Sequence, residues 1–508
     1  MDIPSPVPTD AYNQELIAQV HPADWQNPIP TGTYNLVVIG GGTAGIISAL
    51  GTAGLGGKVA LIERHLLGGD CLNYGCVPSK ALIRAARACY DARAAAEFGL
   101  VLNGAPSVDF PAIMQRMRRV RAQISHHDSA ARFAGLGVDI FFGDAHFTGP
   151  RAIEVGSQRL EFRRCILATG GRAATPKIPG LEEVGFHTNE SIFSLTELPA
   201  RLLIIGGGPI GCELAQAFRR FGSEVMIVNR SEQCLAKEET DASLHLEAQL
   251  VREGVQIFNR AQVVRCGTVV QRAVPRKLVT LETQTGTQSV ECDAILVAAG
   301  RAPNLDGLGL DSAGIDYDKQ GVTVDDFLRT SNSRVLAAGD IIGKAQFTHA
   351  ADAMARACIQ NAFFFGRQRL SRIVIPRTTY TDPEIASIGL TIAQCADKRI
   401  AIDTYRETLG RVDRAVLDGE DQGFAMIHCQ QGTGRVVGAT IVARHAGEMI
   451  GELSLLMTNK LPLGALAKTV HCYPTQVEVL KRCADQYNKS RLTPRLAGWL
   501  RWILRHRS

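Results

Sequence analysis

The chain has 508 residues, of which 45% are hydrophobic and 21% are charged, a composition typical of a globular protein with about three folded units. A short binding peptide, a disordered chain and a fibrous chain are excluded. Its 13 cysteines are an odd number, and its first residues lack the basic and apolar regions of a signal peptide. We therefore expect a reducing, cytoplasmic environment in which any disulfide is catalytic.

Basic side chains are concentrated at the C-terminal end. The net charge is +5, and residues 489–508 contain six Lys or Arg residues and no acidic residue. The rest of the chain carries 49 basic and 50 acidic side chains, so its charges nearly cancel. This overall balance does not predict nucleic-acid binding.

Residues 1–31 contain many prolines and polar residues, and we expect them to form a surface arm with little structure of its own. The next segment, residues 34–57, has 24 consecutive uncharged residues, which is long enough for a transmembrane helix. Eight of these residues are glycines, however, and the apolar run Leu36–Ile39 leads into a glycine cluster and then an Ala- and Ile-rich run. This order predicts a buried strand, a tight turn and a helix instead of a membrane span.

The turn in this segment has the spacing Gly40-x-Gly42-x-x-Gly45, which is typical of dinucleotide-binding sites. Glycines at these positions let the backbone approach a pyrophosphate, and the N-terminus of the helix attracts its negative charge. Glu63 lies 23 residues after Gly40, at the end of the next predicted strand, where its carboxylate can accept hydrogen bonds from ribose hydroxyls. The pattern favours a dinucleotide site over a purely structural turn.

Two cysteines, Cys71 and Cys76, lie in the glycine-flanked segment that follows. Cysteines five residues apart on a regular helix are too distant for a disulfide, but Gly75 and Pro78 predict an irregular first turn that allows one. The dipole of the helix would lower the pKa of a thiol near its N-terminus. Zinc binding and a pair of free thiols are the alternatives, although no second ligand pair with suitable spacing accompanies these cysteines.

A second strand, glycine turn and helix occupy residues 201–221, with the spacing Gly206-x-Gly208-x-x-Gly211. The residue in register with Glu63 is Asn229, and Arg230 follows it. Without a carboxylate there is no repulsion against a 2′-phosphate, and a guanidinium can pair with one, so this site favours NADPH over NADH. A solvated surface arginine is the alternative. Because the cysteine pair lies between two dinucleotide motifs, a redox role is favoured for it.

Up to about residue 372 the chain alternates short apolar strands with helical stretches, which predicts doubly wound α/β domains. From about residue 373 the strands are spaced differently and are followed by helical segments, which indicates a separate α+β domain. Seven short motifs are distributed along residues 34–488: GGGTAG, GGDCLNYGCVPSK, the ATG at 168–170, GGGPIGCE, GRAPN at 300–304, AAGD at 337–340 and TYTDPEIASIGLT at 379–391. Together they resemble the FAD-dependent pyridine nucleotide-disulfide oxidoreductases, the group of glutathione reductase, dihydrolipoamide dehydrogenase and mercuric reductase.

The resemblance implies an α/β fold with two Rossmann-like dinucleotide-binding domains, for FAD and NAD(P), and a C-terminal α+β dimerisation domain. The segments we predict are an N-terminal arm (1–31), the first part of the FAD domain (32–185), the NAD(P) domain (186–302), the second part of the FAD domain (303–372), the dimerisation domain (373–488) and a basic amphipathic tail (489–508).

The resemblance also implies the roles of particular residues. NADPH would reduce the flavin, and the flavin would reduce a Cys71–Cys76 disulfide, with Cys76 nearest the flavin as the charge-transfer thiolate and Cys71 as the exchange thiol. Lys80 and Glu213 would form an ion pair near the reacting edge of the flavin. The expected cofactor-binding residues are Gly40, Gly42, Gly45, Glu63, Thr169, Gly170 and Asp340 for FAD, with Asp340 on the ribityl chain, and Gly206, Gly208, Gly211, Asn229, Arg230 and Gly300 for NADP.

The C-terminal domain departs from the glutathione and dihydrolipoamide enzymes. There, a His-Pro-Thr sequence with a following Glu supplies an imidazole across the dimer, whereas this chain has Tyr473 at the imidazole position and keeps Glu478. A phenol with a pKa near 10 cannot cycle protons easily at neutral pH, so ordinary dithiol exchange should be slower. A tyrosine here is similar to mercuric reductases. We expect Tyr473 and Glu478 of one subunit of a homodimer to complete the cysteine site of the other.

The two ends of the chain differ from those of mercuric reductases, which end in a vicinal cysteine pair and often begin with a small metal-binding domain. This chain ends in Arg505-His506-Arg507-Ser508 and begins with the arm, so the resemblance does not predict how a metal would be delivered to the site. Cys472, beside Tyr473, is either a substitute thiol ligand or a packed interface cysteine.

The tail has the pattern of a short basic amphipathic helix. Thr493 can cap it and Pro494 can begin it, while Leu496, Trp499, Leu500 and Ile503 recur at helical spacing with Arg501 and Arg505 elsewhere on its surface. Such a helix either makes weak contact with an anionic membrane surface or packs on its own dimer.

We therefore predict a homodimeric, mercuric reductase-like flavoprotein that passes electrons from NADPH through FAD and the Cys71–Cys76 disulfide to a small-molecule or metal–thiol acceptor. We predict no resident metal and no nucleic-acid partner. A reductase of a small disulfide, dihydrolipoamide or a quinone is the first alternative. A redox-sensing or membrane-docked interaction protein is the second.

Overall fold

The computed structural model describes residues 6–101, 104, 106–271 and 274–506. They form two compact units, one from residues 1–231 and 253–373 and the other from residues 232–252 and 374–508. The first unit contains a mixed seven-stranded sheet and a parallel four-stranded sheet, both with helices, and the second unit contains an antiparallel sheet with helices. The predicted fold class, two Rossmann-like domains plus a C-terminal α+β domain, is thus confirmed. The six segment boundaries stay a prediction.

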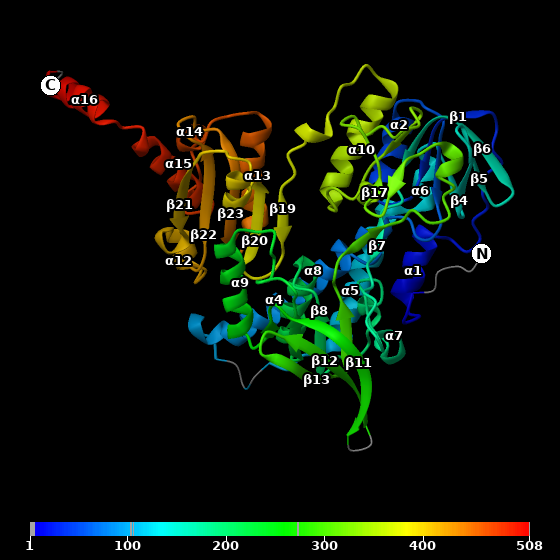
Figure 1. Ribbon diagram of the computed structural model, residues 1–508, viewed down its shortest axis with the longest axis horizontal. Helices are drawn as coiled ribbons and strands as arrows, with labels where there is room; N and C mark the ends of the chain where they lie inside the picture. Colours follow the sequence, from blue (N-terminus) through cyan, green and yellow to red (C-terminus); the bar gives the residue numbers. More distant parts are fainter. Residues whose placement is uncertain (1–5, 102–103, 105, 272–273, 507–508) are drawn as a thin grey trace. The chain divides into compact units, whose positions relative to one another are not determined.

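The larger sheet of the first unit has seven strands, in the order β3-β2-β1-β6-β5-β4 with β18 paired to β6 (Figure 1). Five of them pair in parallel, which places their carboxyl ends, where ligands bind in doubly wound folds, at one edge. The strands are β1 (Thr33–Ile39), β2 (Val59–Glu63), β3 (Val138–Phe142), β4 (Ala145–Gly149), β5 (Ala152–Val155), β6 (Gln158–Leu167) and β18 (Val335–Ala337).

The helices of the first unit pack against its strands and against one another. The helices α2 (Thr43–Gly54) and α10 (Thr348–Phe363) pack against each other, and so do α4 (Cys76–Ala94) and α5 (Phe110–Ser125). The shorter helices are α3 (Gly69–Asn73), α6 (Ala130–Gly135) and α7 (Leu181–Val184). Residues 34–57 form β1 and α2, as predicted, and no helix within the described residues is long and apolar enough to cross a membrane.

The parallel sheet of the first unit has the order β10-β9-β8-β14. Its strands are β8 (Arg201–Ile205), β9 (Glu224–Val228), β10 (Gln256–Phe258) and β14 (Ala294–Val297), and α8 (Pro209–Phe221) connects β8 to β9. Antiparallel pieces complete the unit: the sheet of β11 (Gln262–Gln271), β12 (Val274–Thr283) and β13 (Gly286–Cys292), the pair β7 (Gly171–Ala173) and β15 (Arg301–Pro303), and the pair β16 (Tyr317–Asp318) and β17 (Gly321–Val322).

The N-terminal arm has more structure than the sequence predicts, so that expectation was wrong. It contains the helix α1 (Ala11–Val20), whose Leu16 and Val20 are fully buried. These two apolar residues are one helical turn apart and therefore share a face, a signal that the prolines and polar residues around them conceal.

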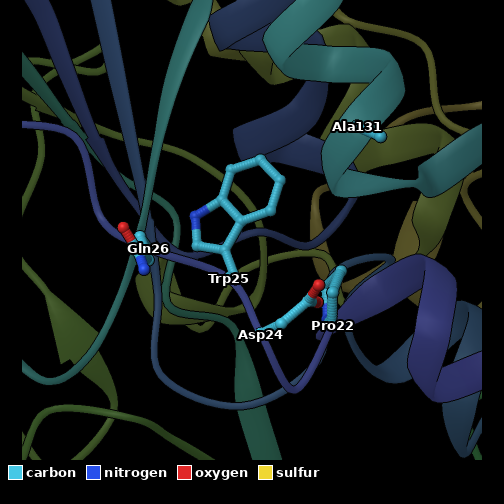
Figure 2. Close-up of a pocket in the computed structure, with 5 residues that line it drawn as sticks. All are labelled: Pro22, Asp24, Trp25, Gln26 and Ala131. Atoms are coloured by element: carbon cyan, nitrogen blue, oxygen red, sulfur yellow. The ribbon is translucent and has the colours of Figure 1, made fainter.

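Beyond α1 the arm runs along strand β3. The indole N–H of Trp25 donates to the Ile140 carbonyl oxygen at 3.2 Å, and the Asn27 amide exchanges two hydrogen bonds of 2.8 Å with the backbone of Phe142. Trp25 and Ala131 line a shallow pocket at this place (Figure 2). Hydrogen bonding to the edge strand thus holds this part of the arm.

The second unit is built on a five-stranded antiparallel sheet in the order β19-β20-β23-β22-β21. The strands are β19 (Arg377–Thr379), β20 (Glu384–Gly389), β21 (Ile402–Thr408), β22 (Phe424–Gln430) and β23 (Val436–Ala443). Side chains from α13 and α15 pack with those of the sheet in one buried core. The helices are α11 (Ile392–Asp397), α12 (Asp413–Leu417), α13 (Ala446–Thr458), α14 (Gly464–Lys468), α15 (Glu478–Ser490) and α16 (Pro494–His506).

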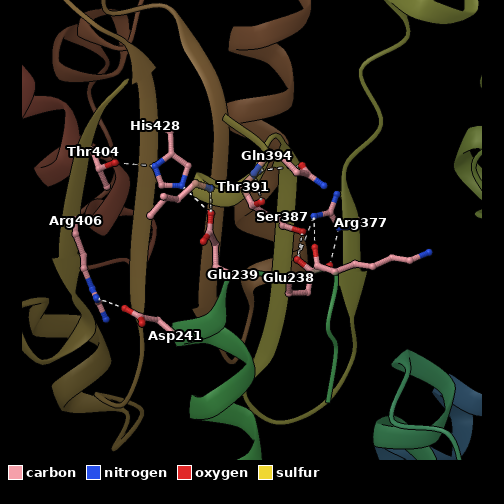
Figure 3. Close-up of polar contacts among 12 residues, drawn as sticks. Glu238, Glu239, Asp241, Arg377, Ser387, Thr391, Gln394, Thr404, Arg406 and His428 are labelled. Atoms are coloured by element: carbon pink, nitrogen blue, oxygen red, sulfur yellow. Dashed lines mark hydrogen bonds and ion pairs between the residues drawn. The ribbon is translucent and has the colours of Figure 1, made fainter. Parts of the chain in front are cut away.

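Residues 232–252, which include α9 (Thr240–Arg252), belong to this second unit although they follow β9 in sequence. Three acidic residues hold the segment there (Figure 3). Glu238 pairs with Arg377 at 2.6 Å, and Asp241 pairs with Arg406 at 2.5 Å.

The third acid, Glu239, has the most buried partner. Its Oε1 accepts from the Ile392 backbone N–H at 2.7 Å and lies 3.1 Å from Nε2 of His428, which is fully buried. The other ring nitrogen of His428 lies 2.9 Å from the Thr404 hydroxyl. Every polar atom of the imidazole therefore has a partner, as a buried ring requires.

We expect Glu239→Ala to lower the thermal unfolding midpoint much more than Asp241→Ala, as measured by differential scanning calorimetry. Breaking a buried pair costs about 3 to 5 kcal/mol because the partner is left unsatisfied, whereas an exposed pair contributes about 1 kcal/mol or less. Asp241 and Arg406 are 51% and 45% exposed, which makes Asp241→Ala a matched control on the same segment. Equal shifts in the two variants would contradict this assignment.

Candidate active site

The first glycine turn leaves open space where a cofactor would approach. Gly40 has a φ of +106°, and a Cβ on it would collide with the Ala168 carbonyl oxygen. A Cβ on Gly45 would collide with the Gly40 oxygen, whereas the nearest atom to a Cβ on Gly42 is 3.8 Å away. The outer glycines thus allow helix and strand to pack closely, and the middle one borders free space at the N-terminus of α2. This geometry fits a pyrophosphate.

Glu63 ends strand β2 beside this turn. Its carboxylate accepts hydrogen bonds from the backbone N–H groups of Gly41 at 2.6 Å and His65 at 2.7 Å. Removal from water raises the pKa of Glu63, while these two hydrogen bonds and the nearby Arg64 lower it. The backbone thereby fixes one side of the carboxylate, and each oxygen keeps a lone pair for a further donor.

A pocket begins at Gly40 and Glu63 and is continued by residues from later in the chain. Thr169 and Asn304 line it together, and each bonds the backbone of the other: the Thr169 hydroxyl donates to the Asn304 carbonyl at 2.8 Å, and the Asn304 amide donates to the Thr169 carbonyl at 2.9 Å. Gly170 accepts from the Asn304 backbone N–H at 3.0 Å. The structure therefore brings the first glycine motif, Glu63 and the ATG segment into one site.

The second glycine turn repeats the geometry of the first. Gly206 has a φ of +120°, and a Cβ on it would collide with the Ala298 carbonyl oxygen. A Cβ on Gly211 would collide with the Gly206 oxygen, whereas a Cβ on Gly208 would meet nothing within 4 Å. The first unit thus contains two copies of one glycine-turn geometry, and both fit a phosphate.

Beside this second turn, strand β9 ends at Val228 and is followed by the two residues that distinguish the second motif from the first. Asn229 is buried, and its amide donates to Asn259 Oδ1 at 2.9 Å, while Arg230 is exposed. No carboxylate occupies the position that corresponds to Glu63. Gly300, which precedes β15, has open space around its Cβ position.

The cysteine pair lies at an interrupted helix, as the sequence predicts. Helix α3 carries Cys71 and ends at Asn73, and α4 begins at Cys76 after the break at Tyr74 and Gly75. Both residues are free thiols here. Cys76 Sγ lies 3.4 Å from the hydroxyl of Thr348, the first residue of α10.

These contacts make the two thiols chemically different. A hydrogen bond from Cys71 is the largest influence on Cys76, and together with Thr348 and Lys80 it lowers the pKa of Cys76 to about 6 despite burial. The same hydrogen bond and burial raise the pKa of Cys71. The pair therefore holds one thiolate, on Cys76, and one proton, on Cys71. Thr348 was missed from the sequence because it lies 272 residues away and no motif includes it.

The ion pair expected between Lys80 and Glu213 is present. Lys80 Nζ donates to Glu213 Oε2 at 2.8 Å. Glu213 is almost fully buried in α8, whereas about a third of the Lys80 side chain is exposed. Lys80 lies one turn after Cys76 on α4, so its ammonium group and the Cys76 sulfur share a face of the helix.

Arg301 forms ion pairs with both Asp70 and Asp340, which the sequence did not predict. Arg301 lies between them, 3.2 Å from a carboxylate oxygen of each. Its guanidinium also donates to the Gly171 carbonyl at 2.9 Å. Burial raises the pKa of Asp340, and Arg301 opposes that effect. The arginine belongs to the GRAPN motif, so this segment contributes a charge as well as the glycine that the sequence singled out.

Tyr473 and Glu478 belong to the second unit and do not bond to each other. The Tyr473 phenol is 73% exposed and donates to Asp413 Oδ2 at 2.8 Å. That hydrogen bond raises the pKa of Tyr473. Glu478 instead pairs with Arg482 at 2.9 Å, one turn along α15. Within the chain Asp413, not Glu478, therefore orients the phenol, and nothing in the tyrosine motif itself points to Asp413.

Among the residues that the structure describes, no three His, Cys, Asp or Glu side chains are grouped so that they could hold a metal ion. Zinc binding at Cys71 and Cys76 therefore lacks a third ligand there. Cys472 is exposed.

Comparisons with known proteins agree with this geometry. The family model described as pyridine nucleotide-disulphide oxidoreductase matches residues 34–355, and the dimerisation domain of the same family matches residues 375–484. The chain is 34% identical to a mercuric reductase of Streptomyces lividans over 89% of its own length and 96% of that protein. It is 32% identical to a dihydrolipoyl dehydrogenase of Chlamydia muridarum over 88% and 95% of the two chains.

Solved structures are similar as well. The HOCl-induced flavoprotein disulfide reductase RclA from Escherichia coli superposes with a TM-score of 0.78 at 26% identity, covering 89% of this chain and 99% of that one. LpdA from Mycobacterium tuberculosis gives a TM-score of 0.80 at the same identity, with the same coverage. The chain therefore belongs to the pyridine nucleotide-disulphide oxidoreductase family, which is FAD-dependent and takes its electrons from NAD(P)H.

Proposed function

We propose that the chain is an NADPH-dependent flavoprotein that reduces a Cys71–Cys76 disulfide and passes the electrons to a thiol-bound metal acceptor, as a mercuric reductase does. The observation that carries the proposal is the pair of thiols at the break between α3 and α4, in a unit that also contains two glycine turns with the same geometry. When bound, FAD supplies the redox group between the pyridine nucleotide and the disulfide. Gly40, Gly42, Glu63, Thr169 and Asp340 would hold it.

The roles of the protein groups follow from their charges. Lys80 would face the flavin with its ammonium group fixed by Glu213, and its positive charge also stabilises the Cys76 thiolate. Cys71, which keeps its proton, would be the exchange thiol that meets the acceptor. Thiolates are the ligands that soft metal ions prefer, so the reduced pair can bind Hg(II) as substrate. Two electrons from NADPH would then reduce it to Hg(0), which has no affinity for thiolates comparable to that of Hg(II) and leaves.

The choice between a metal acceptor and a disulfide rests on Tyr473. Reduction of a disulfide requires protonation of the leaving thiolate, which an imidazole provides well near neutral pH. The Tyr473 phenol has a raised pKa and stays protonated, so it cannot exchange its proton readily. Reduction of Hg(II) to Hg(0) breaks no S–S bond, so no thiolate leaving group of a substrate disulfide has to be protonated, and this favours the metal acceptor. A small disulfide, dihydrolipoamide or a quinone is the second candidate, favoured by the similarity to dihydrolipoyl dehydrogenase.

We infer a homodimer from the dimerisation-domain match, with Tyr473 and Glu478 of one subunit completing the cysteine site of the other. A cytoplasmic location stays a prediction.

The acceptor is tested by following NADPH oxidation with Hg(II) presented as a thiol complex and, separately, with oxidised lipoamide, glutathione disulfide and a quinone. We expect Hg(II) to support the highest kcat/KM and Cys71→Ser and Cys76→Ser to abolish it. A higher kcat/KM for any of the other acceptors would reject the mercuric reductase-like proposal and leave the family assignment intact.

Removing the donors around Cys76 should raise its pKa. In the reduced protein, the rate of Cys76 alkylation by iodoacetamide should rise with pH around pH 6, because a lowered pKa gives the thiolate above that value. Thr348→Val should move this rise to higher pH, and Cys71→Ala should move it further, since Cys71 is the larger influence. Mass spectrometry of the Cys76 peptide measures the rate, with Cys472 as the internal control. An unchanged profile in Cys71→Ala would show that the two thiols are not coupled.

Coenzyme choice is predicted to depend on Arg230. Arg230→Ala should lower kcat/KM for NADPH roughly 10- to 150-fold, the equivalent of one charge-assisted contact, and change that for NADH far less. The matched control is Arg64→Ala, because Arg64 follows Glu63 in the same register of the first motif and should affect both coenzymes alike. Steady-state kinetics with each coenzyme give the answer, and equal losses in Arg230→Ala would exclude a role in coenzyme choice.

Tyr473→His should raise turnover with lipoamide or glutathione disulfide about tenfold or more, because an imidazole titrates near neutral pH. Reduction of Hg(II) should fall or stay the same. Tyr473→Phe, which removes the phenol without adding an imidazole, is the control and should give no gain with disulfides. If Tyr473→His also gives none, proton transfer at residue 473 does not limit the reaction.

A further inference from the structure

Helix α16 exposes apolar side chains that nothing in the described part of the chain covers. It runs from Pro494 to His506, and none of its residues is buried. Leu496, Trp499, Leu500 and Leu504 are 41%, 58%, 38% and 75% exposed. The Thr493 hydroxyl accepts from the Leu496 backbone N–H at 3.3 Å, so the predicted cap is present and defines where the helix begins.

The arrangement of side chains around α16 is strongly amphipathic. At 100° per residue the apolar side chains form one stripe about 140° wide, composed of Trp499, Ile503, Leu496, Leu500 and Leu504 in order around the helix. Arg495 flanks one side of the stripe and Arg501 the other. Arg505 lies on the face opposite to it. Cations thus border the apolar stripe on both sides.

The positive charge of residues 489–508 favours binding of α16 to an anionic surface. Residues 489–508 contain six Lys or Arg residues and no acid, whereas the rest of the chain is almost neutral. A helix with arginines at the borders of an apolar stripe matches an anionic lipid bilayer, where phosphates pair with the guanidinium groups while the apolar side chains enter the acyl boundary.

The tryptophans support the same surface. Two of the three tryptophans of the chain lie on α16. Trp499 is at the edge of the stripe, and Trp502 is displaced to the polar side, where its ring stacks on His506 with 4.8 Å between ring centroids. An indole ring at the border between an apolar and a charged face, as Trp499 has, is typical of the membrane–water interface.

We propose that α16 is a membrane-surface anchor that binds bilayers rich in anionic phospholipid. The helix has 13 residues and carries three arginines, so it lies in the plane of the interface and does not cross the bilayer. The proposal is independent of the acceptor that the enzyme uses.

The test measures binding of the full-length holoenzyme to vesicles by sedimentation. We expect binding to vesicles of phosphatidylcholine and phosphatidylglycerol in equal parts, little binding to pure phosphatidylcholine, and release by high salt. Arg501→Ala/Arg505→Ala should lower the partition coefficient roughly 25-fold, at about fivefold for each arginine. Leu500→Glu should abolish binding, whereas Leu136→Glu, the same change at another exposed leucine, should not.

Intrinsic fluorescence gives a second readout. Anionic vesicles should shift the tryptophan emission to shorter wavelength, and the shift should vanish in Trp499→Phe/Trp502→Phe, which retains only Trp25. NADPH oxidation should be unchanged in all these variants and reports that they are folded. Absence of binding to anionic vesicles would overturn the proposal, as would equal binding of the Leu500→Glu protein. If a chain that ends at Arg491 loses its dimer mass in light scattering and the intact chain ignores vesicles, α16 belongs to the dimer instead.

Discussion

The proposed chemistry of this protein depends on keeping a single thiolate at the first residue of α4. Cys76 would be mostly a neutral thiol at pH 7 if it were free in water. Three parts of the first unit lower its pKa: Cys71 on α3, Thr348 at the start of α10 and Lys80 one turn along α4. Glu213 holds the lysine in place from α8. The break at Tyr74 and Gly75 makes this possible, since it brings two cysteines that an unbroken helix would separate within hydrogen-bonding distance.

The sequence was most informative where function restricts the local backbone. The two glycine turns could be predicted because only glycine avoids a collision at Gly40 and Gly206, so the spacing of the residues reflects the geometry directly. Glu63 and the cysteine pair followed from their distance to these turns. Local spacing could not identify the Lys80–Glu213 ion pair, because the two residues are far apart in sequence. Only the resemblance to the family predicted it.

Residues that act through tertiary contact could not be found in this way. Thr348 and Arg301 contact the site from distant segments, and the sequence around each of them gives no sign of that contact. Asp413 likewise accepts a hydrogen bond from Tyr473, 60 residues further along the chain. The prediction of little structure in the N-terminal arm was wrong for a different reason. Its prolines suggested disorder, while two apolar residues one turn apart, Leu16 and Val20, were enough to bury a helix. Composition averages over a segment, and burial depends on which side chains share a face.

The redox role of the cysteine pair is tested most directly by counting thiols with and without NADPH. The aerobically purified holoenzyme is denatured and alkylated under anaerobic conditions, before or after addition of NADPH, and the peptide containing Cys71 and Cys76 is weighed by mass spectrometry. Before NADPH is added, we expect an unlabelled peptide that is two hydrogens lighter than the dithiol form. After NADPH is added, we expect the peptide to be labelled on both cysteines. Two labels before NADPH, or none after it in an enzyme that oxidises NADPH, would show that this pair does not carry the electrons.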